Sequence, residues 1–131
     1  MRAELLLWVF VVLALSMPAR ADIRRECRKQ SGVSWAALKK LKAGDLEVTD
    51  AKLKCYVKCF MQKNGLVSET GDVDVEKAVK HFPENLQKDA RNVLRRCVDR
   101  PKSTEPCEKA FQVAKCYMTA HPEVLKHVSF V

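Results

Sequence analysis

Hydrophobic residues recur at helical spacing along most of the chain, and the pattern is clearest between residues 53 and 61. The apolar positions there follow the i, i+3, i+4, i+7, i+8 order of a helix with one buried face, and they are Leu53, Tyr56, Val57, Phe60 and Met61. Thr49 or Asp50 can cap the start of this segment, and Asn64-Gly65 is a typical end. The pattern predicts an amphipathic helix between these two signals.

The same spacing predicts further helices on both sides of this one. They cover residues 22–31, residues 35–42, a short stretch from Asp72 or Asp74 to Phe82, residues 84–99 and residues 105–120. Ser34 can cap the second of these helices, and Ser103 or Thr104 can open the last. Residues 66–72 read as a polar loop, and no alternating strand pattern of useful length occurs. The predicted fold class is therefore all-α.

The first 21 residues have the organisation of a secretory signal peptide. A short polar start that carries Arg2 precedes an unbroken apolar run over residues 5–15, and Ala19-Arg20-Ala21 is a small-residue cleavage pattern. The apolar run is too short for a membrane span, which needs about 20 residues. We therefore expect a signal peptide over residues 1–21 and one secreted, extracellular domain over residues 22–131, with no transmembrane segment.

Six cysteines, at positions 27, 55, 59, 97, 107 and 116, lie in the predicted mature domain. Export to an oxidising compartment favours disulfides over metal ligands. Two direct bridges are disfavoured: Cys55 and Cys59 are four positions apart on one helix, and Cys107 and Cys116 would lie about 13 Å apart on a continuous helix. Of the 15 pairings that six cysteines allow, ten remain. We expect bridges that tie different helices together.

The chain is basic, with 24 lysines and arginines against 16 aspartates and glutamates and a net charge of +8. This balance admits an alternative function as a cationic secreted host-defence protein or a protein that binds anionic surfaces. Acidic residues are interspersed with the basic clusters at residues 39–42 and 95–100, as is typical of the polar faces of amphipathic helices. Binding of nucleic acid is not indicated, because the predicted export and the lack of a readable motif argue against it.

The sequence holds no arrangement of residues that is typical of an enzyme. A secreted phospholipase needs a His-Asp pair beside paired cysteines and a glycine-rich calcium loop, but no histidine neighbours a cysteine here and the chain has four glycines. Six bridged cysteines also leave no thiol nucleophile. We therefore expect a protein without catalytic activity.

Behind the signal peptide, the cysteines follow the order Cys-x27-Cys-x3-Cys-x37-Cys-x9-Cys-x8-Cys on predicted helices. This order, and above all its gaps of 3 and 8 residues, resembles that of the insect odorant-binding proteins, the pheromone and general odorant-binding family of the six-cysteine type. Cys55-Tyr56-Val57-Lys58-Cys59 and Ala114-Lys115-Cys116 also look like family sequence around the second, third and sixth cysteines. The resemblance covers essentially the whole of residues 22–131.

The resemblance implies a compact bundle of about six helices around an apolar cavity, tied by three interlocked disulfides. The implied pairs are Cys27–Cys59, Cys55–Cys107 and Cys97–Cys116. The implied function is that of a secreted carrier, which binds small hydrophobic molecules such as odorants or pheromones and transports them through an aqueous secretion. No cofactor and no metal is required. An odorant receptor is a candidate partner, and we expect a monomer or a weak homodimer.

The resemblance also implies which residues line the cavity. They are Met61, Leu66, Val79, Phe82, Leu86, Ala110, Ala114 and Tyr117, with Phe130 and Val131 as a lid. For each of these residues, plain packing in a core is the alternative interpretation. Tyr117 alone among them carries a hydroxyl group, so we expect a mostly apolar ligand whose polar group, where it has one, meets Tyr117 or the backbone.

Five of the nine residues from 123 to 131 are apolar, and this predicts that the tail folds back over the body. Histidines occur in the tail at His127, beside Phe82 at His81, and at a predicted helix end at His121. Protonation of His127 between about pH 5 and pH 7 could loosen a buried tail and release a ligand. Solvated surface histidines without any such role are the alternative.

Overall fold

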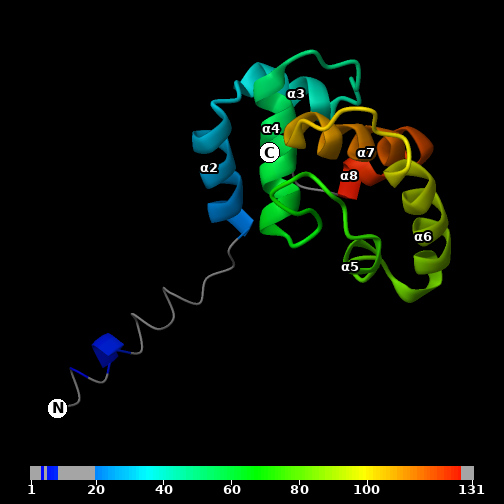
Figure 1. Cartoon of the computed structure of the whole chain (residues 1–131). Helices are drawn as coiled ribbons and strands as arrows, with labels where there is room; N and C mark the ends of the chain where they lie inside the picture. Colours follow the sequence, from blue (N-terminus) through cyan, green and yellow to red (C-terminus); the bar gives the residue numbers. More distant parts are fainter. Residues whose placement is uncertain (1–3, 5, 9–19, 128–131) are drawn as a thin grey trace.

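The computed structural model describes residues 4, 6–8 and 20–127. From residue 20 onward the helices are α2 (Arg20–Ser31), α3 (Trp35–Lys42), α4 (Ala51–Lys63), α5 (Val75–Val79), α6 (Glu84–Val98), α7 (Pro106–Ala120) and α8 (Val124–His127). Helix α2 runs alongside α4 on one side, and α5, α6 and α7 lie on the other side of α4 (Figure 1). Helices α2 and α7 both pack against α4, and α6 packs against α5 and α7. The predicted all-α fold class is confirmed.

Short-range caps set the starts of three helices where the sequence predicted them. The Ser34 side chain accepts a hydrogen bond from the Ala37 amide at the start of α3. The Asp50 side chain likewise accepts hydrogen bonds from backbone amides at the start of α4, and the Asp74 side chain does so at the start of α5. These caps satisfy backbone N–H groups that have no partner inside the helix, so local sequence decides where each helix begins.

The start of α7 differs from the prediction, which placed its cap at Ser103 or Thr104. The cap is Glu105, whose carboxylate accepts from the amides of Cys107 and Glu108. Pro106 then occupies the first turn, where its missing N–H costs nothing. Two other bounds also differ: α2 begins at Arg20 rather than Asp22, and α5 ends at Val79 before it reaches Phe82.

The loop between α4 and α5 is held against the start of α7. An isolated β-bridge joins Val67 to Val73, and the Lys109 ammonium pairs with the Asp72 carboxylate, which lowers the pKa of that carboxyl. At the tip of the loop, Gly71 lies against the backbone of Pro106 with φ +84°. The loop is therefore a fixed part of the body rather than a free connection.

The buried apolar residues fall into three clusters. The largest cluster joins α2, α3, α4 and α7 and contains Cys27, Leu38, Leu41, Leu53, Tyr56, Val57, Phe111 and Met118. A second cluster of Ala78, Val79 and Leu94 joins α5 to α6, and a third of Val93, Cys97 and Val113 joins α6 to α7. A domain of this size usually has one contiguous core. A division into three clusters leaves boundaries in the interior at which a ligand could bind.

Three disulfides tie the helices across these clusters. Cys27 of α2 is bonded to Cys59 of α4, Cys55 of α4 to Cys107 of α7, and Cys97 of α6 to Cys116 of α7. These are the pairs that the family resemblance implied. Beside the second bond, Lys54 Nζ lies 2.6 Å from Glu108 Oε2, so the contact between α4 and α7 holds both a covalent bond and an ion pair.

The first part of the C-terminal tail folds back onto the body, as predicted. Val124 and Leu125 of α8 pack against the largest cluster. A Cβ atom placed on Gly44 would lie 3.9 Å from Leu125 Cδ1, which locates α8 beside the turn after α3. The other apolar residues of the tail, Val128, Phe130 and Val131, lie outside the described residues.

Candidate ligand-binding site

Four of the predicted lining residues come together where α5, α6 and α7 meet. Leu66 and Tyr117 pack against the cluster that contains Val79, and the rings of Phe82 and Tyr117 are 5.6 Å apart between centroids. Val79 is 1% exposed. Tyr117 is at least 35 positions away from Leu66, Val79 and Phe82 in the sequence. The fold places all four residues in one apolar region.

Three further predicted residues face the largest cluster or lie between clusters. Met61 of α4 and Ala114 of α7 are partly buried against that cluster, and Ala110 is fully buried on α7. Ala110, Ala114 and Tyr117 share one face of α7 because they are spaced by four and three residues. This face therefore runs from the largest cluster to the region around Val79.

The remaining predicted residues are not part of this arrangement. Leu86, in the first turn of α6, has 49% of its surface exposed, so a lining role for Leu86 stays a prediction without support from its burial. The proposed lid residues Phe130 and Val131 lie outside the described residues. The resemblance implied a lining role for Leu86, but the buried part of α6 begins at Ala90.

Tyr117 has a central position because it contacts both smaller clusters. Burial raises the pKa of its hydroxyl, and the negative charges of Asp89 and Glu123 raise it further, so the group is neutral at physiological pH. No described residue hydrogen-bonds this hydroxyl. An uncharged hydroxyl at an apolar boundary can donate to a single polar group of a mostly apolar molecule.

The histidines differ in their surroundings. His81 is exposed, whereas the two ring nitrogens of His121 lie 2.9 Å from Asp89 Oδ2 and 2.9 Å from Glu123 Oε1. The His121 ring also lies 5.3 Å from that of Tyr117. No pattern in the sequence predicts the pairing of His121 with Asp89, which lies on α6. The side chain of His127, the residue on which the release hypothesis rests, lies outside the described structure.

Two of the surface hollows formed by the described residues contain no predicted lining residue. One, of about 520 Å³, lies between α6 and α7. The other, of about 180 Å³, lies beside the disulfides of Cys59 and Cys107. Six of the predicted lining residues are in contact with one another or with the clusters, so a ligand among them would have to separate those contacts; they are Met61, Leu66, Val79, Phe82, Ala114 and Tyr117.

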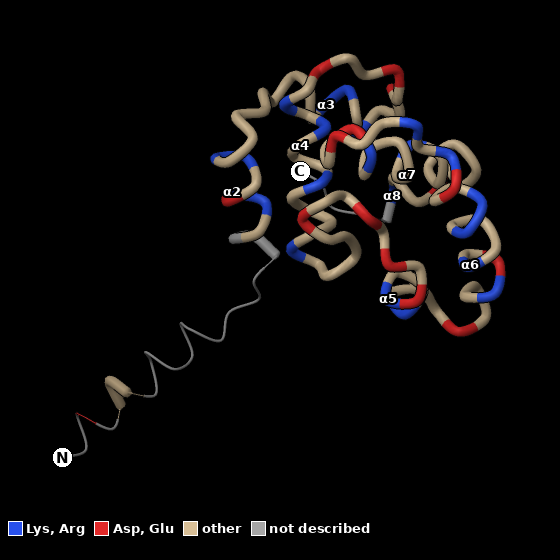
Figure 2. Tube along the Cα trace, in the orientation of Figure 1, with Lys and Arg blue, Asp and Glu red and all other residues tan. Residues whose placement is uncertain are grey.

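Two other properties apply to the described residues alone. No helix there is both long and apolar enough to cross a membrane. Within the same ranges, no group of three or more His, Cys, Asp or Glu side chains could hold a metal ion. Basic and acidic residues both occur on α2, α5, α6 and α7, whereas α3, α4 and α8 carry lysines and no acidic residue (Figure 2).

Comparison with known proteins identifies the family. The profile of the PBP/GOBP family matches residues 17–120, which is most of the chain. The chain belongs to this family of insect odorant-binding proteins. Odorant-binding protein 10 of Aedes aegypti is 33% identical over 93 residues, which cover 70% of this chain and 65% of that protein. The chain thus matches just under two thirds of the length of this relative.

Solved structures of odorant-binding proteins share the fold. An odorant-binding protein of Locusta migratoria, lmigOBP1, superposes with a TM-score of 0.68 at 28% identity, over 82% of each chain. Odorant-binding protein 7 of Anopheles gambiae, described with four disulfide bridges and in complex with an azo compound, gives a TM-score of 0.68 at 25% identity. That match covers 85% of this chain and 94% of the other.

Odorant-binding proteins are secreted, non-enzymatic carriers of small hydrophobic molecules. Membership of the family therefore accounts for the helices, the three disulfides and the apolar region around Tyr117.

Proposed function

We propose that residues 22–131 form a secreted carrier for a small hydrophobic molecule of the odorant or pheromone type. The ligand binds among Met61, Val79, Ala114 and Tyr117 and is carried through an aqueous secretion. The proposal rests chiefly on Tyr117, which packs against both smaller clusters. Val79 belongs to one of these clusters, and Met61 and Ala114 pack against the largest cluster. Together these four residues mark the boundary between the clusters. A ligand at this boundary replaces contacts between clusters with contacts of its own.

The disulfides support this interpretation on energetic grounds. Clusters that are separated from one another forgo part of the dispersion energy of a single packed core. Each native disulfide offsets such a loss by about 2–4 kcal/mol. A cross-linked body can therefore open an interior space for a ligand without unfolding, whereas a helical domain of the same size without bridges has less stability to spare.

The expected ligand is mostly apolar, and its affinity is limited. Ten buried methylene groups contribute about 8 kcal/mol at about 0.8 kcal/mol each, and association costs reduce this value. A dissociation constant of 1 μM corresponds to about 8.2 kcal/mol, so affinities for ligands of this size should be micromolar or weaker. The Tyr117 hydroxyl favours an alcohol, ester or aldehyde over a hydrocarbon of equal length.

A displacement titration tests the proposal. The full chain is expressed in insect cells, its disulfides are verified by mass spectrometry, and an apolar fluorescent probe is displaced by volatile alcohols, esters and aldehydes. The variant Ala114→Leu fills the proposed site, and Ala36→Leu, at an exposed position of α3, is its matched control. We expect Ala114→Leu to weaken probe binding about tenfold or more and Ala36→Leu to leave it unchanged. If the correctly bridged protein takes up no probe, the carrier function is wrong.

The same preparation tests export and the role of Tyr117. Mass spectrometry of protein from the culture medium should show a chain that begins at Asp22. Tyr117→Phe removes one hydroxyl, so it should weaken the binding of an alcohol several-fold and leave a hydrocarbon of equal length unaffected. Equal losses for both ligands would show that Tyr117 acts only through packing.

A further inference from the structure

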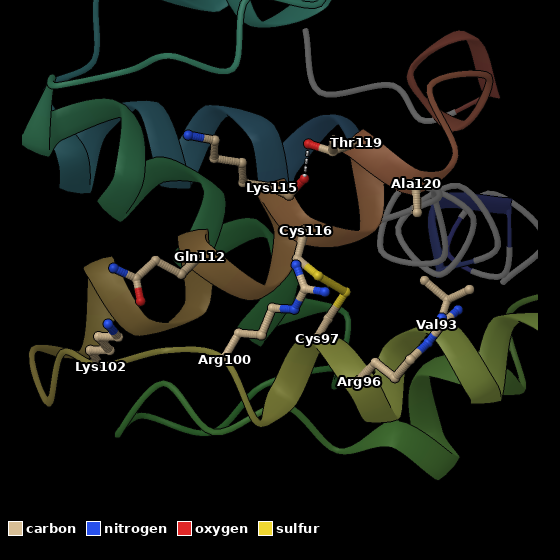
Figure 3. Close-up of a pocket in the computed structure, with 10 residues that line it drawn as sticks. All are labelled: Val93, Arg96, Cys97, Arg100, Lys102, Gln112, Lys115, Cys116, Thr119 and Ala120. Carbon is tan, nitrogen blue, oxygen red and sulfur yellow. Dashed lines mark hydrogen bonds between the residues drawn. A yellow bond between two sulfur atoms is a disulfide. The ribbon is translucent and has the colours of Figure 1, made fainter.

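The hollow between α6 and α7 is separate from the proposed carrier site (Figure 3). Its volume of about 520 Å³ falls in the range of about 300–1,000 Å³ that is typical of small-molecule sites. It is lined by Val93, Arg96, Cys97, Arg100, Lys102, Gln112, Lys115, Cys116, Thr119 and Ala120. Helices α6 and α7, with Arg100 and Lys102 of the segment that joins them, form its walls, and the Cys97–Cys116 bond links the two helices (Figure 3).

Positive charge is concentrated in this hollow. Four of its lining side chains are cationic and none is acidic. Lys115 pairs with Glu47 at 3.2 Å, but no carboxylate among the described residues pairs with Arg96, Arg100 or Lys102. By contrast, two other arginines of α6, Arg91 and Arg95, both pair with Glu76. The described part of the chain therefore does not neutralise the positive charge of the hollow. The resulting positive potential attracts anions.

The deeper part of the hollow is apolar. Val93 is 5% exposed and Cys97 1% exposed, and the Cys116 sulfur, bonded to Cys97, adds to this apolar lining. Ala120 lines the hollow from an exposed position. The Thr119 hydroxyl is engaged with the backbone carbonyl of Lys115. A molecule that enters between the arginines thus meets hydrocarbon and sulfur rather than free polar groups.

We propose that this hollow binds a small amphiphilic organic anion. Its carboxylate pairs with the guanidinium groups of Arg96 and Arg100, which can each hold two carboxylate oxygens at once. A short apolar tail lies against Val93 and the Cys97–Cys116 bond. A flat anionic membrane fits less well, because its headgroups cannot reach an apolar floor that lies between two helices. The site is independent of the proposed carrier function, because the two share no residue.

Paired titrations with octanoate and octanol test this site, because the two ligands share a chain length and differ in charge. The full chain is saturated with the apolar fluorescent probe beforehand, so that the interior is occupied. Binding is followed by calorimetry and by the amide NMR signals of Gln112, Lys115 and Thr119. Arg96→Gln/Arg100→Gln removes two charges from the hollow, and Lys40→Gln/Lys42→Gln removes two exposed charges from α3 as the matched control.

We expect octanoate, and not octanol, to shift the signals around the hollow without displacing the probe. Loss of both arginines should weaken octanoate binding about tenfold or more, whereas the α3 variant binds as the native protein does. Added salt should weaken octanoate binding in the native protein, which provides a readout that needs no variant. The proposal is overturned if octanoate displaces the probe, if the two variants bind it equally, or if only phosphatidylserine vesicles depend on the two arginines.

Discussion

Gly71 provides the most direct test of how the loop between α4 and α5 is held. A Cβ atom at this position would lie 2.9 Å from Pro106 Cα and 3.0 Å from Pro106 C, and closer still to the Pro106 carbonyl oxygen. Pro106 cannot easily move, because it opens α7 and precedes Cys107, which is bonded to Cys55 of α4. Gly71→Ala therefore forces the loop away from α7.

The chain offers a matched control for the conformational part of this effect. Gly65 also has a positive φ, +76° against +84° at Gly71, but a Cβ atom on Gly65 would meet nothing within 4 Å. Gly65→Ala thus carries only the left-handed backbone cost of about 1–2 kcal/mol. Gly71→Ala carries the same cost and adds about 1–3 kcal/mol for the forced contact. The difference between the two variants isolates the contact with Pro106.

Denaturation of both variants with their disulfides intact measures this difference. We expect the free energy of unfolding of Gly71→Ala to lie about 1–3 kcal/mol below that of Gly65→Ala, which is a further loss of about 4–12 °C in Tm at about 4 °C per kcal/mol. Gly71→Ala should also weaken probe binding, because Leu66 lies in the displaced loop. Equal stabilities of the two variants would refute the inference that the loop is wedged against Pro106.

Three further predictions concern the contacts between and within helices. Lys54→Met should destabilise the protein at neutral pH. Lys54 lowers the pKa of Glu108, so the stabilisation by this ion pair is present above the unfolded pKa of about 4.5 and is lost as the pH falls through the folded pKa. In urea titrations, the difference in free energy of unfolding between the variant and the native protein should therefore be smaller at acidic than at neutral pH. A difference that does not depend on pH would contradict the ion pair. Replacing Cys97 and Cys116 by serine should lower the free energy of unfolding by about 3 kcal/mol, and a loss below about 1 kcal/mol in guanidinium titrations would show that the bond adds little. Asp50→Ala should cost about 1 kcal/mol through the lost cap of α4, whereas Asp50→Asn should keep most of the stability because asparagine also caps; equal losses in thermal melts would argue that charge matters rather than capping.

The resemblance of the cysteine order predicted more of the site than the helical pattern did. Val79, Phe82 and Tyr117 were named as neighbours although 38 residues of sequence separate the first from the last, and the structure places them in one region. Leu86 was named on the same basis, yet it is half exposed. Periodicity indicates which face of a helix is apolar, but it does not indicate how far along the helix the neighbouring element extends.

The sequence by itself determined the helices and most of their ends, because a cap depends on residues within one turn. The side chains of Ser34, Asp50 and Asp74 accept hydrogen bonds from amides two or three positions ahead, so these contacts involve neighbouring residues alone. Only the tertiary structure decided which of ten cysteine pairings forms, that His121 meets Asp89, and that Arg96 and Arg100 line one hollow with Lys102 and Lys115. These results depend on the distances between helices, which are set by the packing of all of them together and not by any segment alone.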